Sequence, residues 1–313
     1  MIRKLFWKIL ILLFFLVMVL KAQTSSGPYV IVLGITQDGG YPQAGCTKEC
    51  CRITWENPSS RRHVSCLGIV DPQSKQRWMI DATPDFKYQL HKLDNIFSVE
   101  KSPGLDGILI THGHIGHYTG LINLGREVMG TRGIPLYVMP QMAEFIRHNG
   151  PWDLLIKLKN VGIEELTNKD TLHLNDRLSI QPFKVPHRGE YTETVGFLIS
   201  GPQREVLYIP DIDKWSYWDE EVESYIRESD IAYLDATFFA DGEIPGRNMA
   251  DIPHPFIIES MKRFNKLPLK EKNKIRFIHF NHTNPVLHPE SDARQVVIQN
   301  GFRLAKEEEI ENL

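Results

Sequence analysis

Apolar and polar positions alternate along this chain in short blocks that predict strands and helices in close succession. Runs rich in β-branched and aromatic residues predict buried strands, as in "YVIVLGI" (29–35) and "EVLYIPD" (205–211). Apolar residues at helical spacing predict helices, as in "PDFKYQLHKLDNIF" (84–97) and "PESDARQVVIQN" (289–300). Because such blocks recur through both halves, the pattern predicts one α/β domain over residues 23–313, with a sheet core and outer helices.

The first residues differ from this pattern. Three basic residues among the first eight precede an unbroken apolar run, Ile9–Leu20. The run is shorter than the ~20 residues that a membrane-spanning helix needs, and Ala22 offers a small residue for cleavage. We therefore predict that residues 1–22 are a signal peptide and that the mature protein is exported, to the periplasm or beyond. The alternative is an uncleaved N-terminal membrane anchor.

The charge of the mature protein bears on its partners. Removing residues 1–22 takes away four basic residues and no acidic one, so the formal net charge moves from −3 to −7. An acidic protein has no general attraction for phosphate backbones. The sequence therefore predicts a small-molecule substrate and no nucleic acid, with membrane contact only if the N-terminal segment is retained.

Three histidines lie close together in "ILITHGHIGHYTGL" (108–121), directly after an apolar run. His112 and His114 alternate in what we expect to be an extended loop, and His117 follows three positions later. Imidazole is the commonest protein ligand for zinc and related ions. A strand end that carries H-x-H-x-x-H can bring three ring nitrogens to one point, which predicts a metal site.

"THGHIGHYTGL" resembles the T-H-x-H-x-D-H-x-x-G-L loop of the metallo-β-lactamase fold superfamily. Further motifs of that superfamily follow the same chain order: "WMIDATPDF", "VPHRGEYTETVGF", "VLYIPDID" and "FIHFNHTNP". The resemblance implies an αββα sandwich, in which two β-sheets lie between outer helices and one or two divalent metals bind at the strand ends. It implies these metal ligands: His112, His114, His117, His187, Asp211 and His279. It also implies that the buried Asp81 supports one of these histidines.

Two branches of the superfamily share features with this chain. The motifs "VPHRGEYTETVGF", "IPDIDKW" and "NHTNPVL" resemble the pyrroloquinoline quinone biosynthesis protein B (PqqB) branch. The intact T-H-x-H loop and the H-x-x-H at His279 and His282 also resemble the PhnP-type phosphodiesterase branch, which is associated with carbon–phosphorus lyase.

One position departs from the superfamily motif. Gly116 stands where most hydrolases of this fold have a ligating Asp. In the usual arrangement the first site contains His112, His114 and His187, so only the second site would lose a ligand. We expect that second site to keep His117, His279 and the bridging Asp211, and to be weaker, filled by water or empty. Zinc is favoured, with iron or manganese as alternatives, because N and O ligands alone do not select zinc.

Three cysteines near the N-terminus form a separate candidate site. They are spaced C-x₃-C-C, at Cys46, Cys50 and Cys51. The resemblance to the phosphodiesterase branch implies that they bind a structural zinc together with His282. A disulfide or a reduced pair is the alternative. Cys66 opens an apolar strand and is expected to pack in the core.

Two later residues are candidates for the substrate pocket. His254 follows a helix entry in "MADIPHPF", where Asp251 competes for the same role, and Asp235 ends the strand in "YLDATF". The resemblance implies a supporting role for Asp235. His254 is a candidate proton donor, since an imidazole changes protonation near neutral pH.

These residues predict a metal-dependent hydrolase that uses a metal-activated water on an ester. Asp211 would orient that water or accept its proton. A phosphodiester, a lactone or a thioester would suit this chemistry. One alternative is a PqqB-like role in pyrroloquinoline quinone biosynthesis, with iron activating oxygen. The other is a non-catalytic metal-binding protein.

Overall fold

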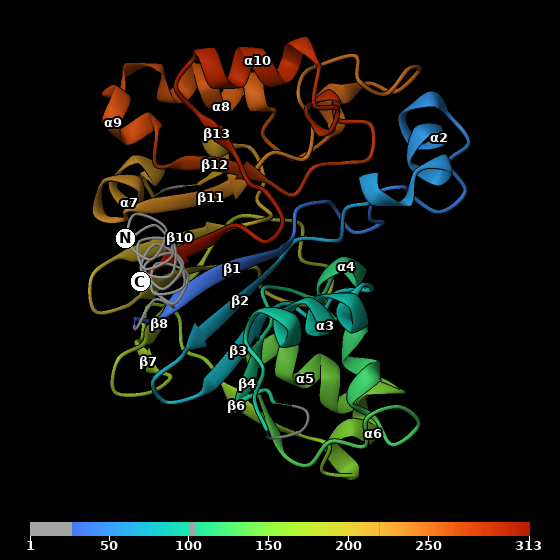
Figure 1. Ribbon diagram of the computed structural model, residues 1–313, viewed down its shortest axis with the longest axis vertical. Helices are drawn as coiled ribbons and strands as arrows, with labels where there is room; N and C mark the ends of the chain where they lie inside the picture. The colour runs from blue at the N-terminus through green and yellow to red at the C-terminus, as the bar shows by residue number, and fades with distance from the viewer. Residues whose placement is uncertain (1–26, 101–103, 219) are drawn as a thin grey trace, which may run out of the picture.

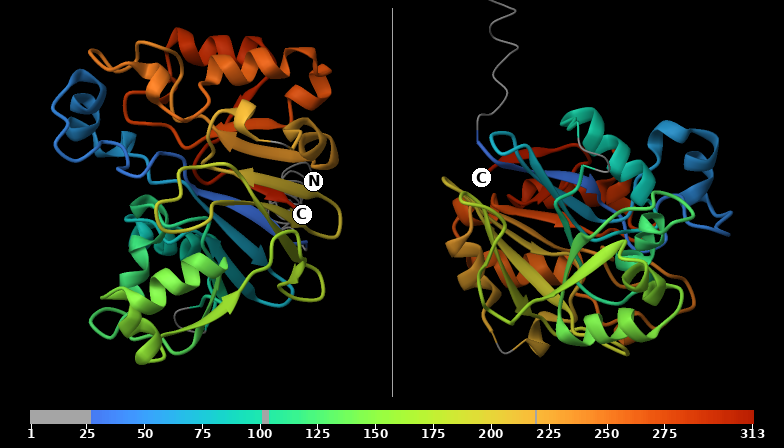
Figure 2. Two further views of the ribbon diagram at one scale, coloured as in Figure 1. Left: turned by 180° about the vertical axis from the view of Figure 1, so that it is seen from behind. Right: turned by 90° about the horizontal axis from the view of Figure 1, so that it is seen from below.

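A computed structural model describes residues 27–100, 104–218 and 220–313. The predicted signal peptide, residues 1–22, lies outside this range. Two seven-stranded sheets pack face to face, with helices on the outer side of each (Figures 1 and 2). The predicted αββα sandwich is confirmed.

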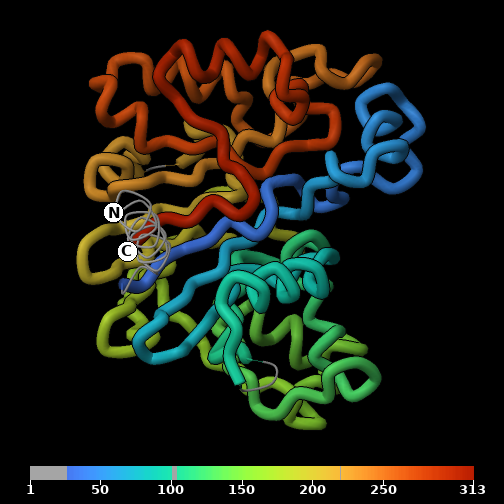
Figure 3. Tube along the Cα trace, in the orientation of Figure 1, coloured from blue at the N-terminus to red at the C-terminus, as the bar shows by residue number. Residues whose placement is uncertain are grey.

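The first sheet carries the N-terminal half of the chain. The β1–β2 and β2–β3 pairs are antiparallel, and the β3–β4, β4–β5 and β5–β6 pairs are parallel. The last strand of the chain, β14, pairs antiparallel with β1 and so joins this sheet (Figure 3). In spatial order the strands are β14 (Ile310–Asn312), β1 (Tyr29–Gly34), β2 (Cys66–Asp71), β3 (Gln76–Ile80), β4 (Gly107–Leu109), β5 (Ile134–Val138) and β6 (Val161–Glu165).

The second sheet carries most of the C-terminal half. Strands β10 to β13 are parallel, and the β7–β8, β8–β9 and β9–β10 pairs are antiparallel. In spatial order the strands are β13 (Arg303–Leu304), β12 (Ile275–Ile278), β11 (Ile231–Asp235), β10 (Glu205–Ile209), β9 (Val195–Ser200), β8 (Ser179–Lys184) and β7 (Leu172–His173).

The helices form two outer layers. Those on the first sheet are α3 (Phe86–Ile96), α4 (Ile115–Tyr118), α5 (Pro140–His148) and α6 (Trp152–Lys157). Those on the second sheet are α7 (Val222–Glu228), α8 (Ile257–Arg263), α9 (Leu269–Lys272) and α10 (Asp292–Gln299). Helix α2 (Glu49–Glu56) projects from one end of the sandwich (Figure 1). Within the described residues, no helix is both long enough and apolar enough to cross a membrane.

Strand β1 shows how the sequence builds both layers of the core. Val30 and Val32 pack in the cluster between the two sheets, whereas Ile31 and Leu33 pack under the outer helices. Successive side chains of a strand point to opposite faces, so a strand covered on both faces is apolar throughout. Burying each such side chain contributes about 1.5–3 kcal/mol.

The strands end before the polar residues that follow them. Strand β4 ends at Leu109, and β10 ends at Ile209, two residues before the end of the strand predicted over 205–211. The carboxyl ends of parallel strands meet at one edge of a sheet, and the loops beyond that edge carry the candidate ligands.

Candidate metal centre

The first ligand group consists of His112, His114, His187 and Asp211, which the fold brings to one point. His112 Nε2 lies 2.9 Å from His114 Nδ1, and His187 Nε2 lies 3.2 Å from the same His114 atom. Asp211 Oδ2 is 3.3 Å from both His112 Nε2 and His187 Nε2. Zinc–nitrogen bonds of about 2.0–2.1 Å in a tetrahedron separate ligand atoms by roughly 3.3 Å. These four atoms therefore have the spacing of a metal site.

The second ligand group consists of Asp38, His117 and His279, beside the same Asp211. His117 Nε2 lies 3.6 Å from Asp38 Oδ1 and 3.8 Å from Asp211 Oδ2. His279 Nε2 lies 3.9 Å from Asp211 Oδ2. Asp211 thus lies between the two groups. The structure also brings the carboxylate of Asp38, which the sequence analysis did not consider, beside His117.

The second group contains buried donor atoms that a metal would satisfy. Buried side-chain atoms without a hydrogen-bond partner among the described residues include Asp38 Oδ1, His117 Nε2, Asp211 Oδ1 and His279 Nε2. An unpaired buried polar atom costs about 1–3 kcal/mol, and a cation bound between these atoms would remove that cost. Nitrogen and carboxylate oxygen suit zinc, iron and manganese alike.

Carboxylates bind the Nδ1 atoms of two histidines, on the side of each ring that faces away from the ligand group. His117 Nδ1 donates to Asp81 Oδ2 over 2.8 Å, and the Thr111 backbone N–H donates to Asp81 Oδ1 over 2.8 Å. His187 Nδ1 donates to Asp213 Oδ1 over 2.9 Å. Such partners fix the ring orientation of metal-binding histidines. Asp81 thus occupies the supporting position that the sequence predicts.

Two residues at the centre have unusual backbone conformations. Both Asp81 and His279 have φ near +70°. A residue other than glycine in this left-handed region costs about 1–3 kcal/mol and is found most often at functional sites. The positions of these two side chains therefore cost folding free energy, which the contacts of the surrounding fold must offset.

Burial and neighbouring charges shift the pKa values of the imidazoles and carboxylates in the cluster. Burial opposes ionisation of Asp211, but His187, His254 and His279 lower its pKa well below the usual value. Burial also opposes protonation of His187, yet Asp211 and Asp213 raise its pKa to about 9. Burial and the neighbouring His117 lower the pKa of His112 well below the usual value.

His254 reaches the cluster, whereas Asp251 is exposed at the end of a 3₁₀ turn (Met249–Asp251). His254 Nδ1 lies 2.8 Å from Asp235 Oδ2 and 3.1 Å from Asp211 Oδ1. Burial opposes protonation of His254, but these two carboxylates raise its pKa well above the usual value. Asp235 also accepts hydrogen bonds from the backbone N–H of Ile212 and from the hydroxyl of Thr237.

The second predicted site, the cysteine cluster, is also assembled. Cys46 Sγ lies 3.7 Å from Cys50 Sγ, and His282 Nδ1 lies 3.7 Å from Cys50 Sγ and 3.3 Å from Cys51 Sγ. Zinc–sulfur bonds of about 2.3 Å imply ligand separations of roughly 3.6–3.8 Å. All three are free thiols. Cys66 is buried in the core under α3, as predicted.

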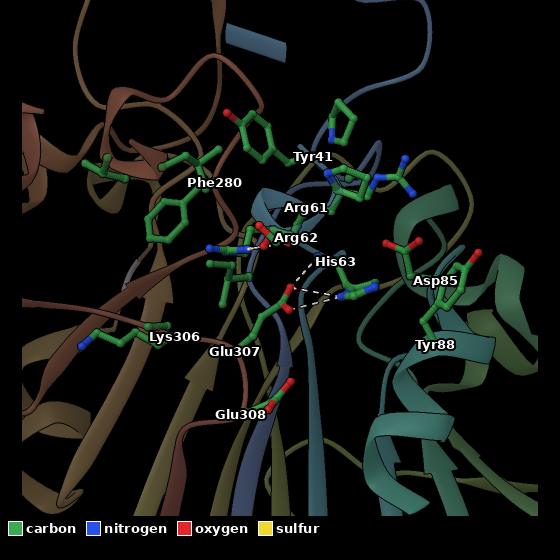
Figure 4. Close-up of a pocket in the computed structure, with 18 of the residues that line it drawn as sticks. Tyr41, Arg61, Arg62, His63, Asp85, Tyr88, Phe280, Lys306, Glu307 and Glu308 are labelled. Atoms are coloured by element: carbon green, nitrogen blue, oxygen red, sulfur yellow. Dashed lines mark hydrogen bonds and ion pairs between the residues drawn. The ribbon is translucent and has the colours of Figure 1, made fainter. Parts of the chain in front are cut away.

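A cavity of about 820 Å³ lies beside the Gly39–Tyr41 segment. Figure 4 shows Glu307 pointing into it, with its carboxylate against His63. The candidate metal ligands are not among its lining residues. A shallower depression of about 460 Å³ includes Glu190, whose Oε2 lies 3.1 Å from His114 Nε2. No candidate ligand lines this depression, but Glu190 connects it to His114 of the first ligand group.

Sequence reasoning missed three acidic residues: Asp38, Glu190 and Asp213. Glu190 and Asp213 lie within the quoted motifs "VPHRGEYTETVGF" and "VLYIPDID" but were not singled out there, and Asp38 belongs to none of the quoted motifs. For Asp38 the available signal was the glycine at position 116, because it indicated that a carboxylate was missing there.

The motifs, the sandwich and the histidine cluster agree with a sequence comparison. A profile described as the Beta-lactamase superfamily domain matches residues 76–280. The chain belongs to this superfamily.

Within the superfamily, the predicted likeness to the PqqB branch is confirmed. The coenzyme PQQ synthesis protein B of Methylorubrum extorquens (strain PA1) is 25% identical over 304 residues, covering 88% of this chain and 97% of that protein. The corresponding protein of Xanthomonas campestris pv. campestris (strain B100) is 24% identical, with the same coverage.

Solved structures show the same fold. Zn(2+)-bound PqqB from Methylobacterium extorquens has a TM-score of 0.77 at 23% identity, covering 91% of this chain and all of that one (100%). A diphosphatase from the PhnP family has a TM-score of 0.62 at 22% identity, covering 91% and 97%. These likenesses show that the chain has the fold of these proteins.

Proposed function

We propose that this protein is a metal-dependent hydrolase that acts on an ester of a small molecule, either a phosphodiester or a lactone. The observation that carries the proposal is the spacing of His112 Nε2, His114 Nδ1, His187 Nε2 and Asp211 Oδ2, which lie 2.9–3.3 Å apart where measured. A metal bound there supplies a water whose pKa falls to about 7 and polarises the scissile bond.

Two side chains are placed to move protons. Asp211, whose pKa the surrounding imidazoles lower, would be ionised and would orient the attacking water or accept its proton. His254, whose pKa Asp235 and Asp211 raise, would carry the proton that a leaving group needs. Glu190, beside His114, lies where a substrate would enter from the shallow depression.

The second candidate is a metal-dependent role like that of the PQQ synthesis proteins. The similarity to these proteins over 97% of their length favours it. The two candidates differ in metal and reaction, because a hydrolase needs no redox-active ion whereas oxygen activation does. We also propose export through residues 1–22, as the sequence predicts.

The test measures metal content and turnover of the purified mature chain. We expect bound zinc, and hydrolysis of bis(p-nitrophenyl) phosphate or of a lactone panel that His114→Ala abolishes. Bound iron with oxygen-dependent turnover and no ester cleavage would favour the second candidate. Stoichiometric metal with neither activity would make the protein a non-catalytic metal binder.

A further inference from the structure

The second ligand group has a carboxylate that the superfamily motif does not provide. We propose that Asp38 supplies the metal ligand that Gly116 cannot, and that Asp38, His117, His279 and Asp211 form a complete second metal position. This inference rests on the proposed function in taking the cluster to bind metal, and it goes further by fixing the number of metals.

The first argument is exclusion of volume. A Cβ atom added to Gly116 would lie 2.0 Å from Asp38 Oδ1 and 2.6 Å from Asp38 Cα. Both distances are shorter than real Cβ contacts, so a side chain at 116 and the carboxylate of Asp38 cannot coexist in this arrangement. The carboxylate of Asp38 therefore lies in the space that a residue with a side chain at 116 would enter.

The second argument is the state of the donor atoms. His117 commits Nδ1 to Asp81, and His279 has its Nδ1 3.0 Å from Thr237 Oγ1. Both Nε2 atoms and Asp38 Oδ1 are buried and have no hydrogen-bond partner among the described residues. The atoms that would face a metal are therefore the ones left over after every orienting contact is made.

The third argument is rigidity. The backbone N–H of Gln37 donates to the carbonyl of Phe280 over 2.9 Å, and Asn281 Nδ2 donates to Gln37 Oε1 over 2.5 Å. The backbone N–H of Gly40 donates to the carbonyl of Gln37 over 2.8 Å. Asp38 thus belongs to a tight turn bonded to the segment that carries His279. A ligand held in advance loses little entropy when metal binds.

The test uses substitutions that place the carboxylate at position 38, at position 116, at both or at neither. Zinc per chain would be counted by elemental analysis after dialysis, with zinc titrations by calorimetry, for the mature wild type and four variants. These are Asp38→Asn, Gly116→Asp, the double variant Asp38→Gly/Gly116→Asp, and Asp170→Asn as an exposed control. Circular dichroism would check that each variant folds.

We expect Asp38→Asn to lose one zinc equivalent, with affinity at that position lower by more than about 100-fold, beyond the 10–100-fold typical of outer supports. Gly116→Asp alone should lose the same equivalent, because its side chain collides with Asp38. The double variant should regain it, and Asp170→Asn should match the wild type. Recovery in the double variant cannot be explained by a general loss of folding.

An Asp38→Asn protein that keeps every zinc equivalent of the wild type would overturn the inference. A double variant that folds but does not regain zinc would do the same. If His114→Ala still loses metal in the first case, the proposed function survives. If the wild type binds zinc only where Cys50→Ser removes it, the inference and the proposed function both fail.

Discussion

The two ligand groups that share Asp211 are assembled in different ways. The first takes His112 and His114 from one loop, two positions apart, and adds His187 from the loop after β8 beside Asp211. The second joins Asp38, His117 and His279 from three distant segments. The ligand atoms of the first group also lie closer together, at 2.9–3.3 Å, than the 3.6–3.9 Å of the second.

This difference teaches which part of a metal site a sequence motif specifies. A local H-x-H pair supplies two of the four residues of the first group, so that half of the group is set within one loop. The second group depends on the turn at Asp38 being bonded to the segment at His279. Perturbations should therefore separate the two groups.

The largest effect is expected for His114→Ala. The first group would lose one of its closest ligands, so zinc binding there should fall by more than about 100-fold and hydrolysis should be lost with it. Zinc at the second group should remain. Zinc counting and ester turnover would measure this, with the exposed His148→Ala as the control. Unchanged turnover in His114→Ala would contradict the assignment.

A matched pair of supporting residues should then separate the groups. Asp213→Asn weakens the orientation of His187 and should lower zinc affinity at the first group by about 10–100-fold. Asp81→Asn should do the same at the second group through His117, and Asn tolerates the positive φ at position 81. Calorimetric titrations would show that Asp213→Asn lowers zinc affinity mainly at the first group and Asp81→Asn mainly at the second. Identical profiles for the two variants would mean that the groups are not separate.

Much of the fold and most of the cluster were predictable from the sequence. The apolar runs of β1, β2 and β10 identified strands, because strands covered on both faces carry apolar residues throughout. The spacing of His112, His114 and His117 was enough to predict them as metal ligands. His187, Asp211 and His279 required motif resemblance, since each stands singly at a strand end.

Asp38 could not be predicted. It lies in an irregular turn with no periodic neighbours, and it comes within 3.6 Å of His117 only because β1 and β12 belong to facing sheets whose loops are bonded together. The gap at Gly116 was readable from the sequence, but the segment that fills it is a property of the tertiary structure.

A smaller effect on the metal centre is expected from Cys50→Ser. The cysteine cluster includes His282, which lies three positions after His279, so it fastens the segment of the second group. We expect the variant to lose the zinc of the cysteine cluster, to melt at a lower temperature, and to weaken the second group by less than about 10-fold. Cys66→Ala, in the core, is the control for zinc content. Equal weakening of both groups would argue against this coupling.

The smallest effect is expected for Glu307→Gln, in the cavity of Figure 4. Burial opposes ionisation of Glu307, but His63 and Lys92 lower its pKa overall. A carboxyl with a lowered folded pKa stabilises the fold above its unfolded pKa of about 4.3, and this stabilisation is lost as pH falls through the folded value. Unfolding experiments should show about 1 kcal/mol lost at pH 7 and no difference from wild type in strong acid.

Glu308→Gln, an exposed neighbour, is the control for that experiment. Zinc content at both ligand groups should be unchanged in Glu307→Gln. A loss that grew toward low pH would reverse the sign and contradict the assignment.

The most direct test of the central claim is anomalous X-ray diffraction from crystals of the metal-loaded protein, recorded at the zinc, iron and manganese edges. We expect one anomalous peak enclosed by His112, His114, His187 and Asp211, and a second enclosed by Asp38, His117, His279 and Asp211. A metal-loaded crystal with no anomalous peak between these side chains would contradict the account.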